Sequence, residues 1–176
     1  MSNYLIPLMV VVPMLCAILV NAFAKFNKSI KVLTFVVAIC LPIIPLLSNY
    51  GLHFFGGYTP MLDNATGVIY HPAITYAFDM LQQIFIAAVG LITFLVAFIY
   101  LSKYKKASGQ YLFLLFMGTA SVTALMLTDD IFNMFVFFEI LALVQVGIVI
   151  ASPMDYSYEM ALKYMILGSI GSPIML

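Results

Sequence analysis

Residues Ile131–Ala151 read IFNMFVFFEILALVQVGIVIA, an apolar run whose one ionisable residue is Glu139. An α-helix rises about 1.5 Å per residue, so about 20 residues cross the hydrocarbon core of a bilayer. Lipid offers no partners for backbone N–H and C=O groups, and a run that crosses it must pair them internally as a helix. The stretch therefore predicts a transmembrane helix. It lacks the alternation of apolar and polar residues that a barrel strand would show.

The rest of the chain repeats this pattern. Five further apolar runs are Tyr4–Ala24, Ile30–Leu47, Met80–Leu101, Tyr111–Thr128 and a shorter one that begins near Ala161. Of the 176 residues, 65% are hydrophobic and only 8% are charged, against about 25% in ordinary soluble domains. The sequence therefore predicts an all-α, polytopic transmembrane bundle of about six helices, with residues 1–176 forming a single membrane domain. The first run is interpreted as a retained helix because its lysines follow it, whereas a secretory signal has them in front.

The lysines predict the orientation of this bundle. Six of the seven fall in two loops on the same side of the membrane, with Lys25, Lys28 and Lys31 in one loop and Lys103, Lys105 and Lys106 in the other. The positive-inside rule makes that side cytoplasmic. The amino terminus and the turn-rich Asn49–Asp79 loop are then expected outside.

Composition and motifs exclude several functions. A net charge of zero, without arginine, does not favour nucleic-acid binding. There is no phosphate loop and no nucleophile–base motif, so we expect neither a catalytic residue nor a cofactor. We also expect no metal, since the spacing of the outer-loop His and Asp residues matches no standard ligand pattern; these residues are His53, Asp63, His71 and Asp79. Cys16 and Cys40, inside apolar runs, are interpreted as packing residues.

Glu139 is the residue best suited to chemistry. It lies nine residues past Asp130, about 13 Å along the helix and close to the bilayer midplane. An ionised carboxylate is costly there unless it is paired or hydrated, whereas the protonated form is neutral. A group poised between these two forms can pass protons, which is the interpretation we favour. The alternative is a neutral Glu that only hydrogen-bonds to a neighbouring helix.

Lys163 is the second candidate, near the cytoplasmic start of the last run. The alternative is a lysine that snorkels to the interface. Glu159 stands four residues before it, at the spacing of an i,i+4 ion pair. If both helices are straight, the backbones of Glu139 and Lys163 differ in depth by about 13 Å. We therefore expect no direct contact between the two side chains.

Other polar residues carry weaker signals. Asp129 and Asp130 fall at the outer mouth of the Ile131–Ala151 run, either as solvated interface charges or as groups that collect ions. Asn133 and Gln145 flank Glu139 six residues away on each side, so neither shares its face of the helix. They either hold water or pack against other helices. Small and hydroxyl residues around Thr119 and Thr123 are typical of close helix packing, and a polar half-channel is the weaker alternative.

The stretch Asp130–Leu141 (DIFNMFVFFEIL) closely resembles the fifth-helix signature of the antiporter-like membrane subunits. These subunits occur in Mrp-type cation/proton antiporters, in respiratory complex I and in membrane-bound hydrogenases. Ala161–Ser169 is similar to the start of the family's sixth helix, and Phe55–Tyr58 with Tyr76–Asp79 to the segment before its third. The resemblance implies that Glu139 is the glutamate of the proton path. It also implies that Lys163 is a lysine found beside that path in many members.

The resemblance covers the amino-terminal part of the family pattern. Members usually have about fourteen helices, and their seventh and eighth carry the lysines that complete the path. Independent transport by this sequence is therefore not expected. We expect residues Lys163–Leu176 to pack against a membrane helix encoded elsewhere, in another chain or in a longer product. A lysine from outside this sequence should approach Glu139.

These observations predict a proton- or cation-translocating membrane subunit of a multi-subunit antiporter or of a respiratory- or hydrogenase-type complex. The expected location is a prokaryotic plasma membrane, and the expected partners are other membrane subunits, lipid, and protons or sodium ions. A non-conducting scaffold is the alternative, and replacement of Glu139 by Gln discriminates the two. A quinone-binding redox protein is a weaker alternative, because no apolar run holds a histidine for haem.

Overall fold

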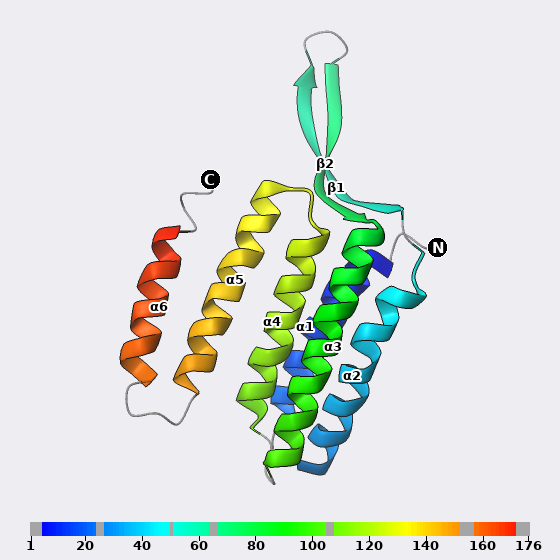
Figure 1. The fold of residues 1–176 in the computed structure, drawn as a ribbon. Coiled ribbons are helices and arrows are strands. Elements are labelled where there is room, and N and C mark those ends of the chain that lie inside the picture. Colours follow the sequence, from blue (N-terminus) through cyan, green and yellow to red (C-terminus); the bar gives the residue numbers. More distant parts are fainter. Residues whose placement is uncertain are drawn as a thin grey trace.

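The computed structural model describes residues 5–23, 27–49, 51–63, 67–104, 108–151 and 157–171. In these ranges the chain forms six helices and one β-hairpin (Figure 1). The helices are α1 (Leu5–Ala22), α2 (Asn27–Leu47), α3 (Met80–Lys103), α4 (Gly109–Leu127), α5 (Ile131–Ile150) and α6 (Ser157–Gly171). Strands β1 (Leu52–Asp63) and β2 (Gly67–Phe78) lie between α2 and α3.

The helices coincide with the predicted apolar runs, and the predicted fold class is confirmed. Both α3 and α5 begin where the sequence indicates, whereas α6 begins at Ser157, ahead of the expected Ala161. Among the described residues, the segments long and apolar enough to cross a membrane are Ile30–Leu47, Met80–Lys103, Gly109–Leu127 and Ile131–Ile150, and α1 adds a shorter apolar stretch, Ile6–Ala22. Large apolar side chains also face outward, with Leu91 and Ile99 of α3 more than half exposed, as suits a surface against lipid.

Helices α1 to α4 form a bundle, and α5 and α6 extend it on one side (Figure 1). Helix α4 packs against α1, α3 and α5. Its buried side chains include Leu112, Phe116 and Ala124. Thr119 of α4 is also buried, and its hydroxyl lies 2.9 Å from that of Thr93 on α3. The predicted packing role of Thr119 is therefore observed as a hydrogen bond between two membrane helices.

Three prolines and one glycine shape the contact between the early helices. Pro13 lies within α1, and Pro42 and Pro45 lie within α2. Each removes the N–H that would bond the carbonyl four residues earlier, a defect that membrane helices tolerate when other groups satisfy that carbonyl. Helix α3 approaches α2 so closely that a Cβ built on Gly90 would lie 2.7 Å from the Pro42 nitrogen. Gly90 thus permits an approach that any larger residue would obstruct.

The connection between α2 and α3 is an antiparallel β-hairpin, where the sequence had indicated only a turn-rich loop. The ribbon projects beyond the helices (Figure 1), while Tyr76, Ala77 and Phe78 at its base are buried against the bundle. The β2 sequence GVIYHPAITYAF is rich in β-branched and aromatic residues, a pattern typical of strands that could have predicted the hairpin.

The strand register also determines how far apart the two histidines of the hairpin lie. His53 pairs with Ala77, whereas His71 pairs with Thr59. Because a strand rises about 3.3 Å per residue, the two histidines lie about 20 Å apart along the ribbon. This separation is too large for both to bind one metal ion.

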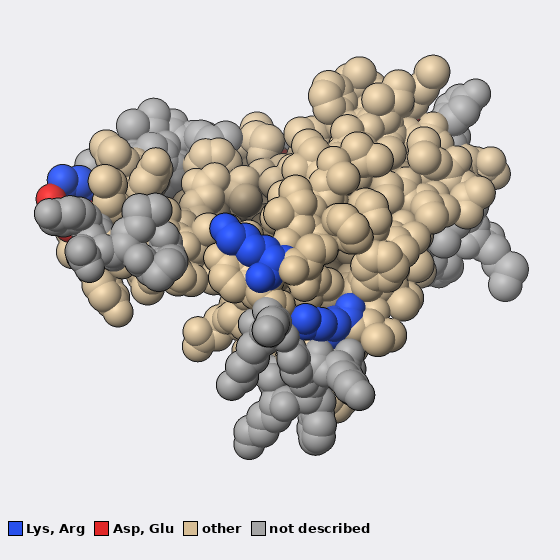
Figure 2. Space-filling model, turned by 60° about the horizontal axis from the view of Figure 1, so that its bottom comes forward, with Lys and Arg blue, Asp and Glu red and all other residues tan. Residues whose placement is uncertain are grey.

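Lysines gather at the end of the bundle opposite the hairpin (Figure 2). Lys31 Nζ donates to the carbonyl of Tyr104 at 3.2 Å, so the start of α2 lies beside the end of α3. The Lys103 ammonium lies 5.7 Å from the centre of the Tyr104 ring. This arrangement agrees with the predicted orientation, in which both basic loops share the cytoplasmic side. Lys25, Lys105 and Lys106 lie outside the described residues.

Candidate functional site

Helix α5 is packed on two opposite faces. Toward α4, a Cβ built on Gly118 would lie 3.2 Å from Val144 Cγ1. Toward α6, a Cβ built on Gly168 would lie 3.6 Å from the Ala142 Cβ. Val144 and Ala142 are two residues apart, which is about 200° around a helix. Helices α4 and α6 therefore cover opposite sides of α5.

Glu139 lies on the side of α5 that faces α6. It precedes Ala142 by three residues, and residues at this spacing share a helix face. It stands about 12 Å from the start of α5, a helix about 30 Å long. The side chain is partly buried, and its carboxylate forms no hydrogen bond or ion pair with any residue in the described ranges. A carboxylate without a partner in the described part of the chain thus occupies mid-depth beside α6.

Lys163 contacts a different acid. Its Nζ lies 2.6 Å from Glu159 Oε1, in the predicted i,i+4 pair, and both side chains are exposed. Glu159 stands in the first turn of α6, ahead of the apolar stretch. The hydrogen bond from Lys163, and then its positive charge, lower the pKa of the Glu159 carboxyl.

The depth of Lys163 explains why it does not reach Glu139. Helices α5 and α6 run antiparallel (Figure 1), and Gly168 lies at the same depth as Ala142. Lys163 is five residues from Gly168, and Glu139 is three residues from Ala142 in the opposite direction along the bundle. The two backbones therefore differ in depth by about 12 Å. Within the described part of the chain the two side chains form no ion pair, as the straight-helix argument predicts.

The residues at the outer end of α5 form hydrogen bonds that connect this helix to the hairpin. Asp130 caps α5, because its carboxylate accepts from the backbone N–H groups of Phe132 (3.3 Å) and Asn133 (3.2 Å). The buried Asn133 amide donates to the Tyr76 hydroxyl at 3.2 Å and to Thr128 Oγ1 at 2.9 Å. These bonds join the start of α5 to the base of the hairpin.

The other predicted positions are placed apart from Glu139. Asp129 is exposed, and its backbone N–H donates to the Thr75 carbonyl at 3.1 Å. Gln145 is exposed on another face of α5, about 120° around the helix from Glu139. Sequence reasoning missed Tyr76, whose role depends on the hairpin register. Neither Gln145 nor Asn133 adds a polar group beside Glu139.

A pair of substitutions separates the capping role of Asp130 from a role in collecting ions. Asp130→Ala removes the side-chain acceptor at the N-cap and is expected to cost about 0.5–2 kcal/mol of stability. Asp130→Asn removes the charge but keeps an equally good cap, and is expected to leave the thermal unfolding temperature unchanged. If Asp130 acts only as a cap, Asp130→Asn should also match the native protein in any assay of ion flux. A marked loss of transport in this variant, with unchanged stability, would show instead that the charge itself matters.

Fold and site together define a polytopic membrane protein with a carboxylate at mid-depth. The chain is 37% identical over 174 residues to an uncharacterized protein of Methanocaldococcus jannaschii. It is 22% identical over 170 residues to a subunit of the Na(+)/H(+) antiporter of Alkalihalophilus pseudofirmus. These matches cover 99% and 97% of this chain but 34% of each relative, so the chain spans about a third of their length. No protein-family model matches the sequence.

The fold is also found in a solved complex. The chain matches one chain in the structure of the membrane-bound sulfane sulfur reductase, an archaeal respiratory membrane complex, with a TM-score of 0.70 and 23% identity. The match covers 96% of this chain and 34% of that one. Together with the antiporter protein, this match confirms the resemblance to the antiporter-like membrane subunits seen in the sequence.

Proposed function

We propose that this chain is the amino-terminal part of a subunit that translocates protons or sodium ions in a multi-subunit membrane complex. The complex is an antiporter or a respiratory or hydrogenase-type assembly in a prokaryotic plasma membrane. Support comes from the likeness to a protein of a Na(+)/H(+) antiporter and to a chain of a respiratory membrane complex. Both likenesses extend over nearly all of the sequence, and both of those proteins are longer.

The observation that carries this proposal is the position of Glu139. The residue lies midway along an apolar helix, is partly buried beside α6, and has no ion-pair partner among the described residues. An acid at this depth is costly when ionised and without a partner, so its charge depends on whether a cation or water is near. That dependence is what a carrier of protons requires.

A proton cycle follows from this dependence. In this scheme Glu139 binds a proton from one side of the membrane, and the positive charge of an approaching cation drives the release of that proton toward the other side. Lys163 is engaged with Glu159 and stands about 12 Å away in depth, so it does not supply that cation in this conformation. We place the cation outside the described residues, in the continuation of the chain or in a neighbouring protein of the complex. In this scheme Lys163 lies at the cytoplasmic end of the path.

Transport by the assembled complex tests the proposal. The complex is reconstituted into liposomes with Glu139→Gln, and Glu159→Gln serves as the matched control, since it makes the same chemical change at an exposed site. A translocating subunit loses transport only in the first variant. A scaffold, the alternative function, keeps transport in both.

A further inference from the structure

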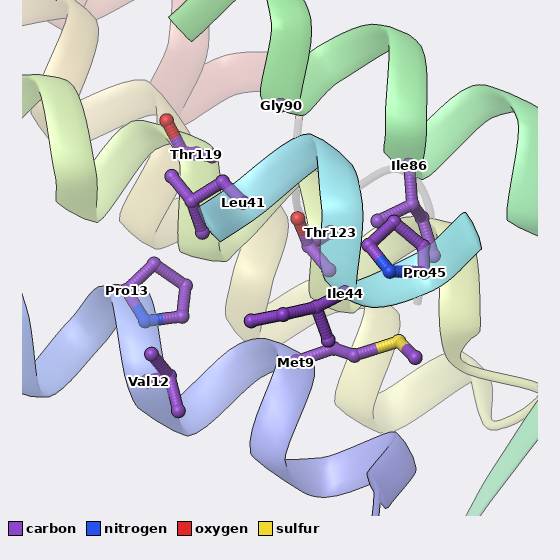
Figure 3. Close-up of a pocket in the computed structure, with 10 residues that line it drawn as sticks. All are labelled: Met9, Val12, Pro13, Leu41, Ile44, Pro45, Ile86, Gly90, Thr119 and Thr123. Atoms are coloured by element: carbon purple, nitrogen blue, oxygen red, sulfur yellow. The ribbon is translucent and has the colours of Figure 1, made fainter. Parts of the chain in front are cut away.

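A small cavity lies inside the bundle, away from Glu139. It holds about 10 Å³ and is lined by residues of α1, α2, α3 and α4 (Figure 3). None of the side chains that line it is charged. A cavity needs roughly 10–15 Å³ to hold one water molecule, together with two to four polar partners. Its volume is therefore at the lower limit for a single water, and the polar partners decide whether one binds.

Two candidate partners are backbone carbonyls that lose their usual helical donor to proline. Pro13 deprives the Met9 carbonyl of its N–H, and Pro45 deprives the Leu41 carbonyl in the same way. All four residues line the cavity, so the two places where proline interrupts α1 and α2 meet at the same space (Figure 3). A buried carbonyl that has neither a protein partner nor water is unfavourable. We therefore expect a hydrogen-bond donor at this point.

The third partner is the hydroxyl of Thr123 on α4. Thr123 lines the cavity and is 3% exposed. Nearby hydroxyls bond to the carbonyl four residues earlier, Thr119 to Leu115 and Ser121 to Met117, each at 2.9 Å. The Thr123 hydroxyl forms no hydrogen bond to any residue in the described ranges. The hydroxyl of this buried residue is thus available at the cavity, without a partner among the described residues.

We propose that this cavity binds one ordered water molecule. The water donates its two hydrogens to the carbonyls of Met9 and Leu41 and accepts a hydrogen bond from the Thr123 hydroxyl. It thereby joins α1, α2 and α4 at the level where the first two are interrupted by proline. Water fits better than a sodium ion, because no carboxylate lines the cavity to offset a charge.

A substitution of equal size tests this site in the whole protein, isolated from membranes with the proteins it assembles with. Thr123→Val removes the hydroxyl and leaves the water short of a donor, so the unfolding temperature is expected to fall by about 2–6 °C. The matched control is Thr34→Val on α2. The Thr34 hydroxyl is buried, has no hydrogen-bond partner among the residues that the structure describes, and does not line the cavity. Its removal should therefore leave the unfolding temperature unchanged or raise it. If Thr123→Val behaves like Thr34→Val, the proposal is wrong.

Two further measurements identify the occupant. Pro45→Ala returns a helical donor to the Leu41 carbonyl, so Thr123→Val should lower the unfolding temperature less in that background. Replacing sodium by choline at constant ionic strength should change nothing. A sodium-dependent unfolding temperature that Thr123→Val abolishes would assign the site to a cation and overturn the proposal. A map that resolves waters should show density within about 3.2 Å of the hydroxyl and both carbonyls, and an empty cavity there would also overturn it.

Discussion

Glu139→Gln is expected to lower ion translocation by the assembled complex about 100-fold, the lower end of what a single proton-transfer group contributes. Gln has nearly the same size and still forms hydrogen bonds, but it neither binds nor releases a proton. Glu139 is partly buried at mid-depth on the side of α5 facing α6. The substitution therefore removes the ionisable group with little change in packing. The measurement is proton or sodium flux into proteoliposomes that contain the complex.

A matched control and a result that would contradict this prediction can both be stated for Glu139→Gln. Glu159→Gln replaces an exposed carboxylate that pairs with Lys163, and flux close to the native rate is expected. Equal amounts of assembled complex in both variants would show that any loss is functional. Native flux in Glu139→Gln would mean that the carboxylate carries no protons, and would support the scaffold function instead.

Gly90→Ala should destabilise the bundle by about 1–3 kcal/mol, the usual cost of forcing extra volume into a packed core. The added Cβ would lie 2.7 Å from the nitrogen of Pro42, 2.8 Å from the carbonyl carbon of Leu41 and 2.9 Å from the Pro42 Cα. These are backbone atoms, so relief requires α2 and α3 to move apart. A lower thermal unfolding temperature of the purified protein measures the effect.

Gly168→Ala is the matched control for this effect. Its Cβ would lie 3.6 Å from the Ala142 Cβ, which is an ordinary contact. Without a clash, Ala should equal or exceed Gly in stability, because Gly in a helix loses more conformational freedom on folding. If Gly90→Ala proves as stable as Gly168→Ala, then α2 and α3 do not approach as closely as the structure has them.

The helices could be predicted from the sequence because their cause is local. A bilayer requires internally paired backbone and apolar side chains, so each run of about 20 apolar residues is a helix whatever its neighbours. The lysines indicated the orientation in the same way. Glu139 also stood out from the sequence alone, because a carboxylate within the apolar run Ile131–Ala151 needs a special environment. The i,i+4 pair of Glu159 and Lys163 follows from helical spacing.

Other features depend on contacts between residues far apart in the chain, and only the tertiary structure decided them. Asn133 bonds Tyr76 of the hairpin, 57 positions earlier in the sequence. Gly90 meets Pro42 only because α3 packs on α2, and the cavity exists only where Pro13, Pro45 and Thr123 converge. The sequence also did not determine which face of α5 meets α6, and therefore did not determine what surrounds Glu139. All six helices are so uniformly apolar that periodicity cannot separate a face against lipid from one against protein, since both surroundings favour the same side chains.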